Sequence, residues 1–237
     1  MSIVAWYRDF TNDEVTARTL SDKSGNGNNG ALQQQAAIIA VAGKGRVISF
    51  PAGVASAAQT PDSPSLSPGA AISVGVWIYR LDNAQATLVQ KDQSYRLRFP
   101  DTSGKPVFEV FIGGSWRSAI SSVAVPTQQW VFLQGSYDGL SLRLFQHGSE
   151  RGLLPQSGMI NDSAAQLLLG APDQFRGTMG EVIVKNSGVM LAEHKADLAR
   201  WLKKETHDII ELLQIKVPGN PINLCTYHQP ITVSVYN

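Results

Sequence analysis

The loop Asp22–Gly30, with the sequence DKSGNGNNG, is the most informative polar cluster in the chain. Asp22, Asn26 and Asn28 offer hard oxygen atoms, which are the ligands that calcium prefers. The same residue types also form Asx turns, in which a side-chain oxygen accepts hydrogen bonds from nearby backbone N–H groups. The sequence therefore leaves two roles open, a calcium site at Asp22, Asn26 and Asn28 or a loop that is stabilised without an ion.

Two acidic residues in β-rich segments, Glu109 and Glu181, are the candidates for acid–base chemistry. Glycoside hydrolysis needs two carboxylates at a fixed separation. Side chains two residues apart share one face of a strand, but both second neighbours of Glu109 and of Glu181 are apolar, and the chain contains no E-x-D-x-E pattern. We therefore predict no catalytic residues and no enzymatic activity, and we rank a polysaccharide hydrolase or lyase last among the functions.

Carbohydrate binding requires aromatic and amide side chains at exposed positions, and Trp116 is the best candidate for the aromatic role. It follows a turn, Gly113-Gly114-Ser115, where a tryptophan is more often exposed than in mid-strand. The same residue could instead fill the core from a returning strand, and both interpretations stay open. Arg117, Tyr95 and Gln93 are the residues that we expect to join it in a ligand site.

The sequence gives little support for other cofactors. Cys225 is the single cysteine, so no intramolecular disulfide can form, and it stands near His228 without an evident orienting group. One cysteine and four histidines are too few and too dispersed for zinc. No glycine-rich loop follows a strand and opens a helix, so we expect no nucleotide, and we expect no haem.

Charge and hydropathy limit the partners. The 237 residues carry a net charge of +1, so the protein has no strong field to attract nucleic acid or an anionic membrane. Residues 1–10 contain Arg8 and Asp9 and lack the apolar run of a Sec signal, and no segment predicts membrane insertion. We expect a cytoplasmic location or export by a route other than Sec.

Short β-rich segments separated by turn residues recur about every ten residues, which is typical of antiparallel sandwiches. In Tyr95–Phe99 (YRLRF) apolar and charged residues alternate, so one face of that strand should be buried. Asp138-Gly139 and Gly113-Gly114 predict hairpin turns. The expected strands are Val74–Tyr79, Ala86–Gln90, Tyr95–Phe99, Val107–Ile112, Trp116–Ile120, Trp130–Ser136, Leu140–Gln146, Ala165–Leu169 and Gly180–Lys185.

The C-terminal part of the chain has a different pattern. Apolar residues between Leu191 and Leu213 recur with helical spacing, and the residues expected on the apolar face are Leu191, Leu198, Trp201, Leu202, Ile209, Leu212 and Leu213. Pro218-Gly219-Asn220-Pro221 ends this helix, and Ile231–Tyr236 could add a last strand. We expect residues 1–190 to form the sandwich, and residues 191–237 to form a helix and tail packed on it or extending from it.

Several segments together resemble the laminin G-like jelly-roll domains of the concanavalin A-like lectin/glucanase superfamily. The resemblance spans about Val4 to Met190, and Leu191–Lys203 is similar to a helix that follows the last strand in some members. Where the family has an acidic residue before its "E-v" motif, this chain has Gly180, so one anionic calcium ligand that the resemblance would imply is missing. The matching segments are DKSGNGNNG at 22–30, ISVGVWI at 72–78, LVQK at 88–91, QWVF at 129–132, GSYDG at 135–139, LRLFQHG at 142–148, LLLG at 167–170 and FRGTMGEV at 175–182.

The resemblance implies an all-β, two-sheet antiparallel jelly roll, with calcium as the candidate cofactor in some members of the family. Together with the missing carboxylate pair, it favours a non-catalytic recognition domain that binds a glycan or a glycosylated or protein surface. The alternative is a structural or assembly module of a larger complex, such as a phage tail, an injection machine or a toxin. In that case residues 191–237 would dock the domain or join copies of it.

Overall fold

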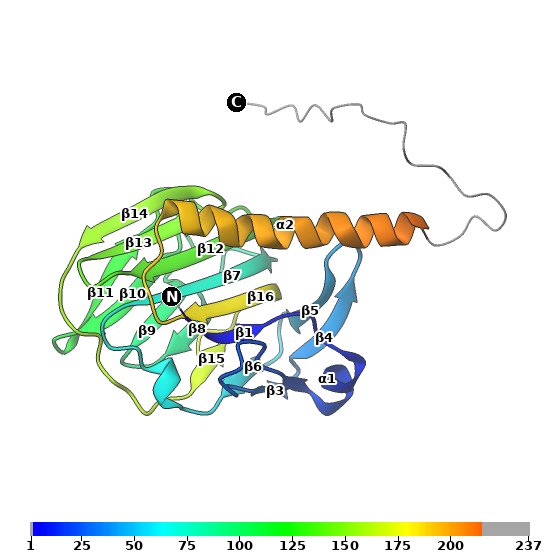
Figure 1. Ribbon diagram of the computed structural model, residues 1–237, viewed down its shortest axis with the longest axis horizontal. Coiled ribbons are helices and arrows are strands. Elements are labelled where there is room, and N and C mark those ends of the chain that lie inside the picture. The colour runs from blue at the N-terminus through cyan, green and yellow to red at the C-terminus, as the bar shows by residue number, and fades with distance from the viewer. Residues whose placement is uncertain (1, 215–237) are drawn as a thin grey trace.

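The computed structural model describes residues 2–214, and the side chains of residues 2–202. Two antiparallel sheets form a sandwich, which confirms the predicted fold class (Figure 1). Sheet A contains, in spatial order, β14 (Ser149–Pro155), β13 (Ser141–Gln146), β12 (Trp130–Tyr137), β7 (Ile72–Arg80), β16 (Gly177–Lys185), β5 (Gly45–Phe50) and β4 (Ala37–Val41), with β1 (Ile3–Tyr7) paired to β16. Sheet B contains β11 (Ser115–Ile120), β10 (Val107–Ile112), β9 (Tyr95–Phe99), β8 (Ala86–Lys91), β15 (Leu167–Leu169), β6 (Ser56–Thr60), β3 (Gly30–Gln34) and β2 (Thr19–Leu20).

Two short helical segments connect these strands. Helix α1 (Asn12–Ala17) begins at Thr11 with a capping box, in which the Thr11 hydroxyl accepts a hydrogen bond from the Glu14 backbone and the Glu14 carboxylate accepts one from the Thr11 backbone. The 3₁₀ turn η1 (Pro64–Leu66) has proline at its first position. The expected strand Ile231–Tyr236 and the residues Cys225 and His228 lie outside the described residues.

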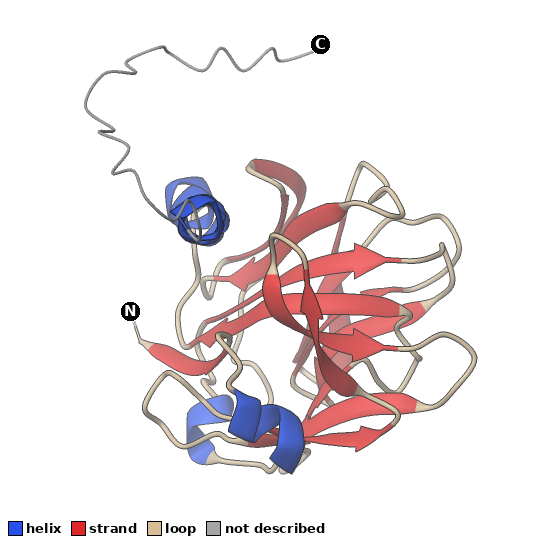
Figure 2. Ribbon diagram, turned by 90° about the vertical axis from the view of Figure 1, so that its right-hand side faces the viewer, coloured by secondary structure: helices blue, strands red, loops and turns tan. Residues whose placement is uncertain are grey.

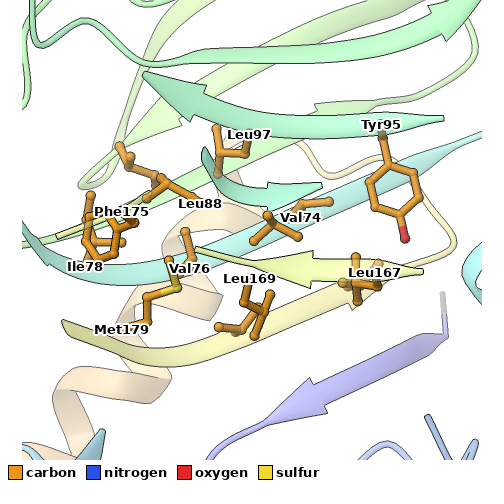
Figure 3. Packing of buried hydrophobic residues seen from close by; sticks show 14 of the residues in the cluster. Val74, Val76, Ile78, Leu88, Tyr95, Leu97, Leu167, Leu169, Phe175 and Met179 are labelled. Carbon is orange, nitrogen blue, oxygen red and sulfur yellow. The ribbon is translucent and has the colours of Figure 1, made fainter. Parts of the chain in front are cut away.

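The core lies between the two sheets and is almost entirely apolar (Figure 3). Alternation along the strands produces it, because every second side chain of a strand faces the same side. Sheet A contributes Val74, Val76 and Ile78 from β7, and these residues meet Leu88 and Leu97 from sheet B. The predicted burial of one face of Tyr95–Phe99 is therefore confirmed, because its apolar residues lie inside and its charged residues outside.

Helix α2 (Leu191–Gln214) packs on the outer side of sheet A, and Figure 2 shows it outside the sandwich. Trp201 anchors it, because its side chain is 3% exposed and its ring stacks on Trp77 of β7 at a centroid distance of 5.4 Å. Phe132 of β12 belongs to the same small cluster. Gly180 of β16 makes room for the anchor, since a Cβ at that position would lie 2.3 Å from Cη2 of Trp201.

A buried polar group lies beside this anchor. The carboxylate of Asp197 accepts hydrogen bonds from Nε2 of Gln134 at 2.8 Å and from Nζ of Lys185 at 2.5 Å. Nη1 of Arg200 donates to the other oxygen at 2.9 Å. Burial alone would raise the pKa of Asp197, but the hydrogen bonds and charges of these neighbours lower it below its usual value. The carboxylate is therefore ionised and fully paired, as a buried charge must be.

The predicted apolar face of α2 needs a correction. Leu198 and Trp201 pack on the sheet, but Leu191 and Leu202 are 38% and 42% exposed. The buried positions at the start of the helix are instead His194 and Asp197, because polar groups of sheet A lie opposite them. Ile209, Leu212 and Leu213 belong to the part of α2 whose side chains the structure does not describe. A docking role for residues 191–237 stays a prediction.

Among the described residues, no helix combines the length and hydropathy that a membrane crossing requires.

Candidate ligand-binding site

The outer face of sheet B carries a row of polar side chains. The described helices lie elsewhere, α2 on sheet A and α1 beside β2 and β4. The strand registers place residues side by side across this face, with Ser118 opposite Glu109, Glu109 opposite Arg96, and Arg96 opposite Gln90. Leu168 of β15 follows Gln90 in the same row. Strands β8 to β11 therefore present a continuous polar surface next to an apolar core.

Glu109 is the centre of this surface. Its side chain is buried, and its Oε2 accepts hydrogen bonds from Nε of Arg96 at 2.5 Å and from Nε of Arg98 at 2.7 Å. The Ser118 hydroxyl donates to Oε1 at 2.7 Å. Burial would raise the pKa of Glu109, but these three hydrogen bonds and the charge of Arg96 lower it below its usual value. Glu109 is therefore a fixed anion that orients two arginines.

Trp116 lies at the rim of the same face, on β11. It is half-buried, with the guanidinium of Arg96 4.0 Å from the ring centroid and the Phe111 ring at 5.2 Å in an edge contact. The backbone N–H of Asn161 donates to the carbonyl of Phe111, and the Asn161 side-chain amide donates to the carbonyl of Gln93. These contacts bring the turn that contains Gln93 to the same rim, and a ligand-binding role for Gln93 stays a prediction.

Two of the predicted ligand residues lie elsewhere. Tyr95 is fully buried and points into the core, as Figure 3 shows, so a ligand on the outer face cannot contact it. Its neighbours on β9, Arg96 and Arg98, face outward instead. Arg117 is exposed but follows Trp116 on the same strand, so it points to the opposite side of the sheet. The expectation that Tyr95 and Arg117 join Trp116 is therefore corrected in favour of Arg96 and Arg98.

Sequence comparison identifies the family. A laminin G-type family model, described as the concanavalin A-like lectin/glucanases superfamily, matches residues 52–189, which is more than half of the chain. The chain belongs to this superfamily. Comparison with curated protein sequences gave no match.

Solved structures resemble the concanavalin A-like domain in fold at low sequence identity. Domain 4 of AbnA, an extracellular arabinanase from Geobacillus stearothermophilus solved in complex with arabinotriose, has a TM-score of 0.64 and 19% identity, covering 81% of this chain and 95% of that one. The binding domain of Paraclostridial Mosquitocidal Protein 1 has a TM-score of 0.64 and 13% identity, covering 81% and 50%. A botulinum neurotoxin type C structure has a TM-score of 0.66 and 12% identity, covering 84% and 51%.

The concanavalin A-like domain thus spans about half the length of the two toxin chains and nearly all of the arabinanase domain. At these identities the likeness establishes the shared jelly-roll fold and nothing about a particular ligand. Binding domains stand among these neighbours.

The Asp22 loop of the domain has the hydrogen bonding of an Asx turn. Oδ1 of Asp22 accepts the backbone N–H of Trp6 at 2.9 Å and of Ser24 at 2.8 Å, and Oδ2 accepts the N–H of Asn28 at 3.0 Å and the Ser24 hydroxyl at 2.7 Å. Asp22 therefore holds the loop, which directly precedes β3, against β1 through a hydrogen bond to Trp6. The side chain of Asn28 is buried, and its Nδ2 donates to the carbonyl of Val4.

The predicted calcium ligands fit this loop-stabilising role better than a metal role. The two Asp22 oxygens face four N–H or O–H donors, which would repel a cation, whereas calcium needs six to eight oxygens around one point. Nδ2 of Asn26 donates to the carbonyl of Ile3, and in residues 2–202 no three His, Cys, Asp or Glu side chains form a metal-binding group. Calcium binding at Asp22, Asn26 and Asn28 stays a prediction.

Replacing Asp22 with alanine should lower the free energy of unfolding by about 3 kcal/mol, because the loop loses the acceptor of four hydrogen bonds, three of them from backbone N–H groups. Asp22→Asn keeps one oxygen and should cost less. Urea unfolding measures both values. Thermal unfolding with calcium or with EDTA separates the two roles, because we expect an equal Tm in both. A calcium-dependent rise in Tm that Asp22→Ala abolishes would instead establish a metal site.

Proposed function

We propose that this domain is a non-catalytic recognition module that binds carbohydrate through the outer face of sheet B. The observation that carries the proposal is the arrangement around Trp116, where an aromatic ring borders a row of oriented polar side chains. Sugar recognition needs this combination, an apolar surface for the ring face and fixed donors and acceptors for the hydroxyl groups. Arg96, Glu109, Ser118 and Gln90 supply the polar groups, and Phe111 extends the aromatic surface.

The structural neighbours support a binding role. Domain 4 of AbnA is a separate domain of an arabinanase and was solved with arabinotriose. The botulinum neurotoxin type C structure is reported with a dependence of cell entry on two ganglioside molecules. Carbohydrate or glycolipid recognition is therefore compatible with this jelly-roll scaffold, which is an argument from analogy at the level of fold.

The state of Glu109 supports the non-catalytic part of the proposal. A glycosidase acid carries a proton at neutral pH because its pKa is raised, and a second carboxylate stands near it. Arg96, Arg98 and Ser118 instead lower the pKa of Glu109, and its direct cross-strand neighbours are Ser118 and Arg96. Glu109 is thus suited to orient the arginines and not to donate a proton.

Replacing Trp116 with alanine should weaken glycan binding by about thirty-fold, which corresponds to about 2 kcal/mol for removal of a central aromatic contact. A glycan array followed by titration calorimetry on the ligand it identifies measures this loss. Trp6→Ala is the matched control, because Trp6 is also half-buried but lies on β1 of sheet A. Binding that is equal in Trp116→Ala and Trp6→Ala, or the lack of any glycan ligand, would contradict the proposal.

A further inference from the structure

The charges around Glu109 do not balance. Two guanidinium groups, those of Arg96 and Arg98, form ion pairs with this single carboxylate. Both arginines belong to β9, lie two residues apart and therefore face the same side of the sheet. Their side chains are only 18% and 19% exposed, so water screens the remaining charge less than at an open surface. The group of three carries a net charge of +1 at neutral pH. The exposed carboxylate of Asp101 interacts electrostatically with Arg98 and offsets part of this charge through solvent.

The hydrogen bonds leave donors available on the same side. Each arginine uses its Nε on the same oxygen, Oε2 of Glu109, and Oε1 is taken by the Ser118 hydroxyl. A guanidinium has five N–H groups, four of them on the two Nη atoms. Among the residues that the structure describes, no acceptor is paired with the Nη groups of Arg96 or Arg98. Glu109 thus fixes the direction of both side chains without saturating them.

A planar carboxylate is the ligand group that fits this arrangement. The fork of Nη donors matches two oxygens in one plane, and such charge-assisted pairs are stronger than the bonds that a neutral hydroxyl can form. The ring of Trp116 packs on the Arg96 guanidinium, so a sugar in contact with that ring would lie within reach of the arginines. The Phe111 ring borders the same place.

We propose that the site around Trp116 selects glycans that carry a carboxylate, such as uronate-containing chains, and that Arg96 and Arg98 bind the acid group. This inference rests on the carbohydrate-binding function proposed above and adds the substrate class to it. Trp116 contacts the apolar side of the sugar ring, and Gln90, which is buried next to Arg96 in the strand register, holds the edge of the site.

The test compares polygalacturonate with its fully methyl-esterified form, which has the same backbone without the charge. At physiological ionic strength we expect the wild-type protein to bind the acid form about tenfold more tightly than the ester. Arg98→Gln should reduce this preference to about twofold. Arg98→Lys keeps the charge but loses the fork, so its preference should be intermediate.

Arg151→Gln is the matched control, because Arg151 is an exposed arginine on β14 of sheet A and its loss changes the net charge equally. It should keep the full preference for the acid form. The Tm of each variant tests whether the fold is intact. If Arg98→Gln is unstable, Arg98→Lys replaces it as the variant in which the preference for the acid form is measured.

Three results would overturn the inference. Equal, Trp116-dependent binding of the acid and the ester would remove the carboxylate preference and leave the carbohydrate function in place. A preference that persists in Arg98→Gln, or that falls equally in Arg151→Gln, would assign it to the overall charge of the protein. If neither polymer nor any neutral glycan binds, the proposed function itself fails together with the inference.

Discussion

Replacing Trp201 with alanine should release helix α2 from sheet A and lower the free energy that holds it there by about 3–4 kcal/mol. The large value follows from removing a nearly fully buried indole whose site cannot collapse, because Trp77 and Phe132 belong to a rigid sheet. Hydrogen exchange of the α2 amides should accelerate strongly, whereas the amides of β8 to β10 should keep their protection. Urea unfolding followed by tryptophan fluorescence measures the change in free energy.

A double-mutant cycle with Gly180 identifies the contact itself. Gly180→Ala alone should be destabilising, because the added Cβ would lie 2.3 Å from the Trp201 ring. In the Trp201→Ala background the same methyl group has room, so it should cost almost nothing. Additive effects of the two substitutions would contradict the proposed packing. Trp116→Ala serves as a control, because Trp116 lies on β11 of sheet B and outside the Trp77 cluster.

Acidification should weaken the docking of α2 between pH 6.5 and pH 4, through His194. This imidazole is fully buried between the rings of Phe132 and Phe145, at centroid distances of 5.2 and 5.0 Å. Its Nε2 accepts the backbone N–H of Gly148 at 2.9 Å, so Nε2 carries no proton and Nδ1 donates to Oε1 of Gln134. A second proton on Nε2 would face another N–H donor, so the docked helix requires a neutral imidazole.

The direction of the effect follows from the pKa values of the two states. Burial lowers the pKa of His194 to about 4, and the charge of Asp197 opposes this only in part, while His147, Lys185 and Lys195 lower it further. The undocked imidazole has its ordinary pKa of about 6.5. Above pH 6.5 neither state binds the proton, so stability does not change with pH. Between 6.5 and 4 only the undocked state binds it, so docking loses up to about 3 kcal/mol as the pH falls.

Urea unfolding at pH 7.5, 6.0 and 5.0, monitored by the fluorescence of the Trp77 cluster, measures this loss. His194→Gln should be less stable at pH 7.5 but should lose the pH dependence in this window. His147→Gln removes an exposed histidine near Trp77. It should keep most of the pH dependence but reduce it slightly, because His147 is one of the groups that lower the pKa of His194. A slope that is the same in the wild type and in His194→Gln would assign the effect to other groups, such as carboxylates that titrate at lower pH.

Strands β7 to β13, β15 and β16 could be predicted from the sequence, whereas β1 to β6 and β14 (Ser149–Pro155) could not. Strands β7 to β13 are rich in β-branched and aromatic residues, and turns such as Asp138-Gly139 separate them, so both existence and approximate bounds follow from local pattern. Strands β3 (GALQQ) and β6 (SAAQT) consist of residues with weak β propensity. They form because partners distant in sequence pair with them, such as β15 with β6.

The candidate site was predictable only in part, because its residues meet through strand register. Trp116 could be chosen from its turn, but Glu109 appeared as an isolated carboxylate until the pairing of β10 with β9 and β11 placed it between Arg96 and Ser118. A shift of one residue in either register would have sent Glu109 to the core. The alternation in Tyr95–Phe99 was the available signal, since it already placed Arg96 and Arg98 outside and Tyr95 inside.

The packing of Trp201 of α2 against Gly180 of β16 also gives a rule for recognising related chains. The position before Glu181, where the resembled family carries an acidic residue, is occupied here by Gly180, and the ring of Trp201 takes the space that a side chain would fill. A larger residue at that position and a docked indole exclude each other. Members of the superfamily with glycine immediately before this glutamate and a tryptophan in the following helix should therefore carry the same covered sheet, and such a subgroup can be collected from sequence alone.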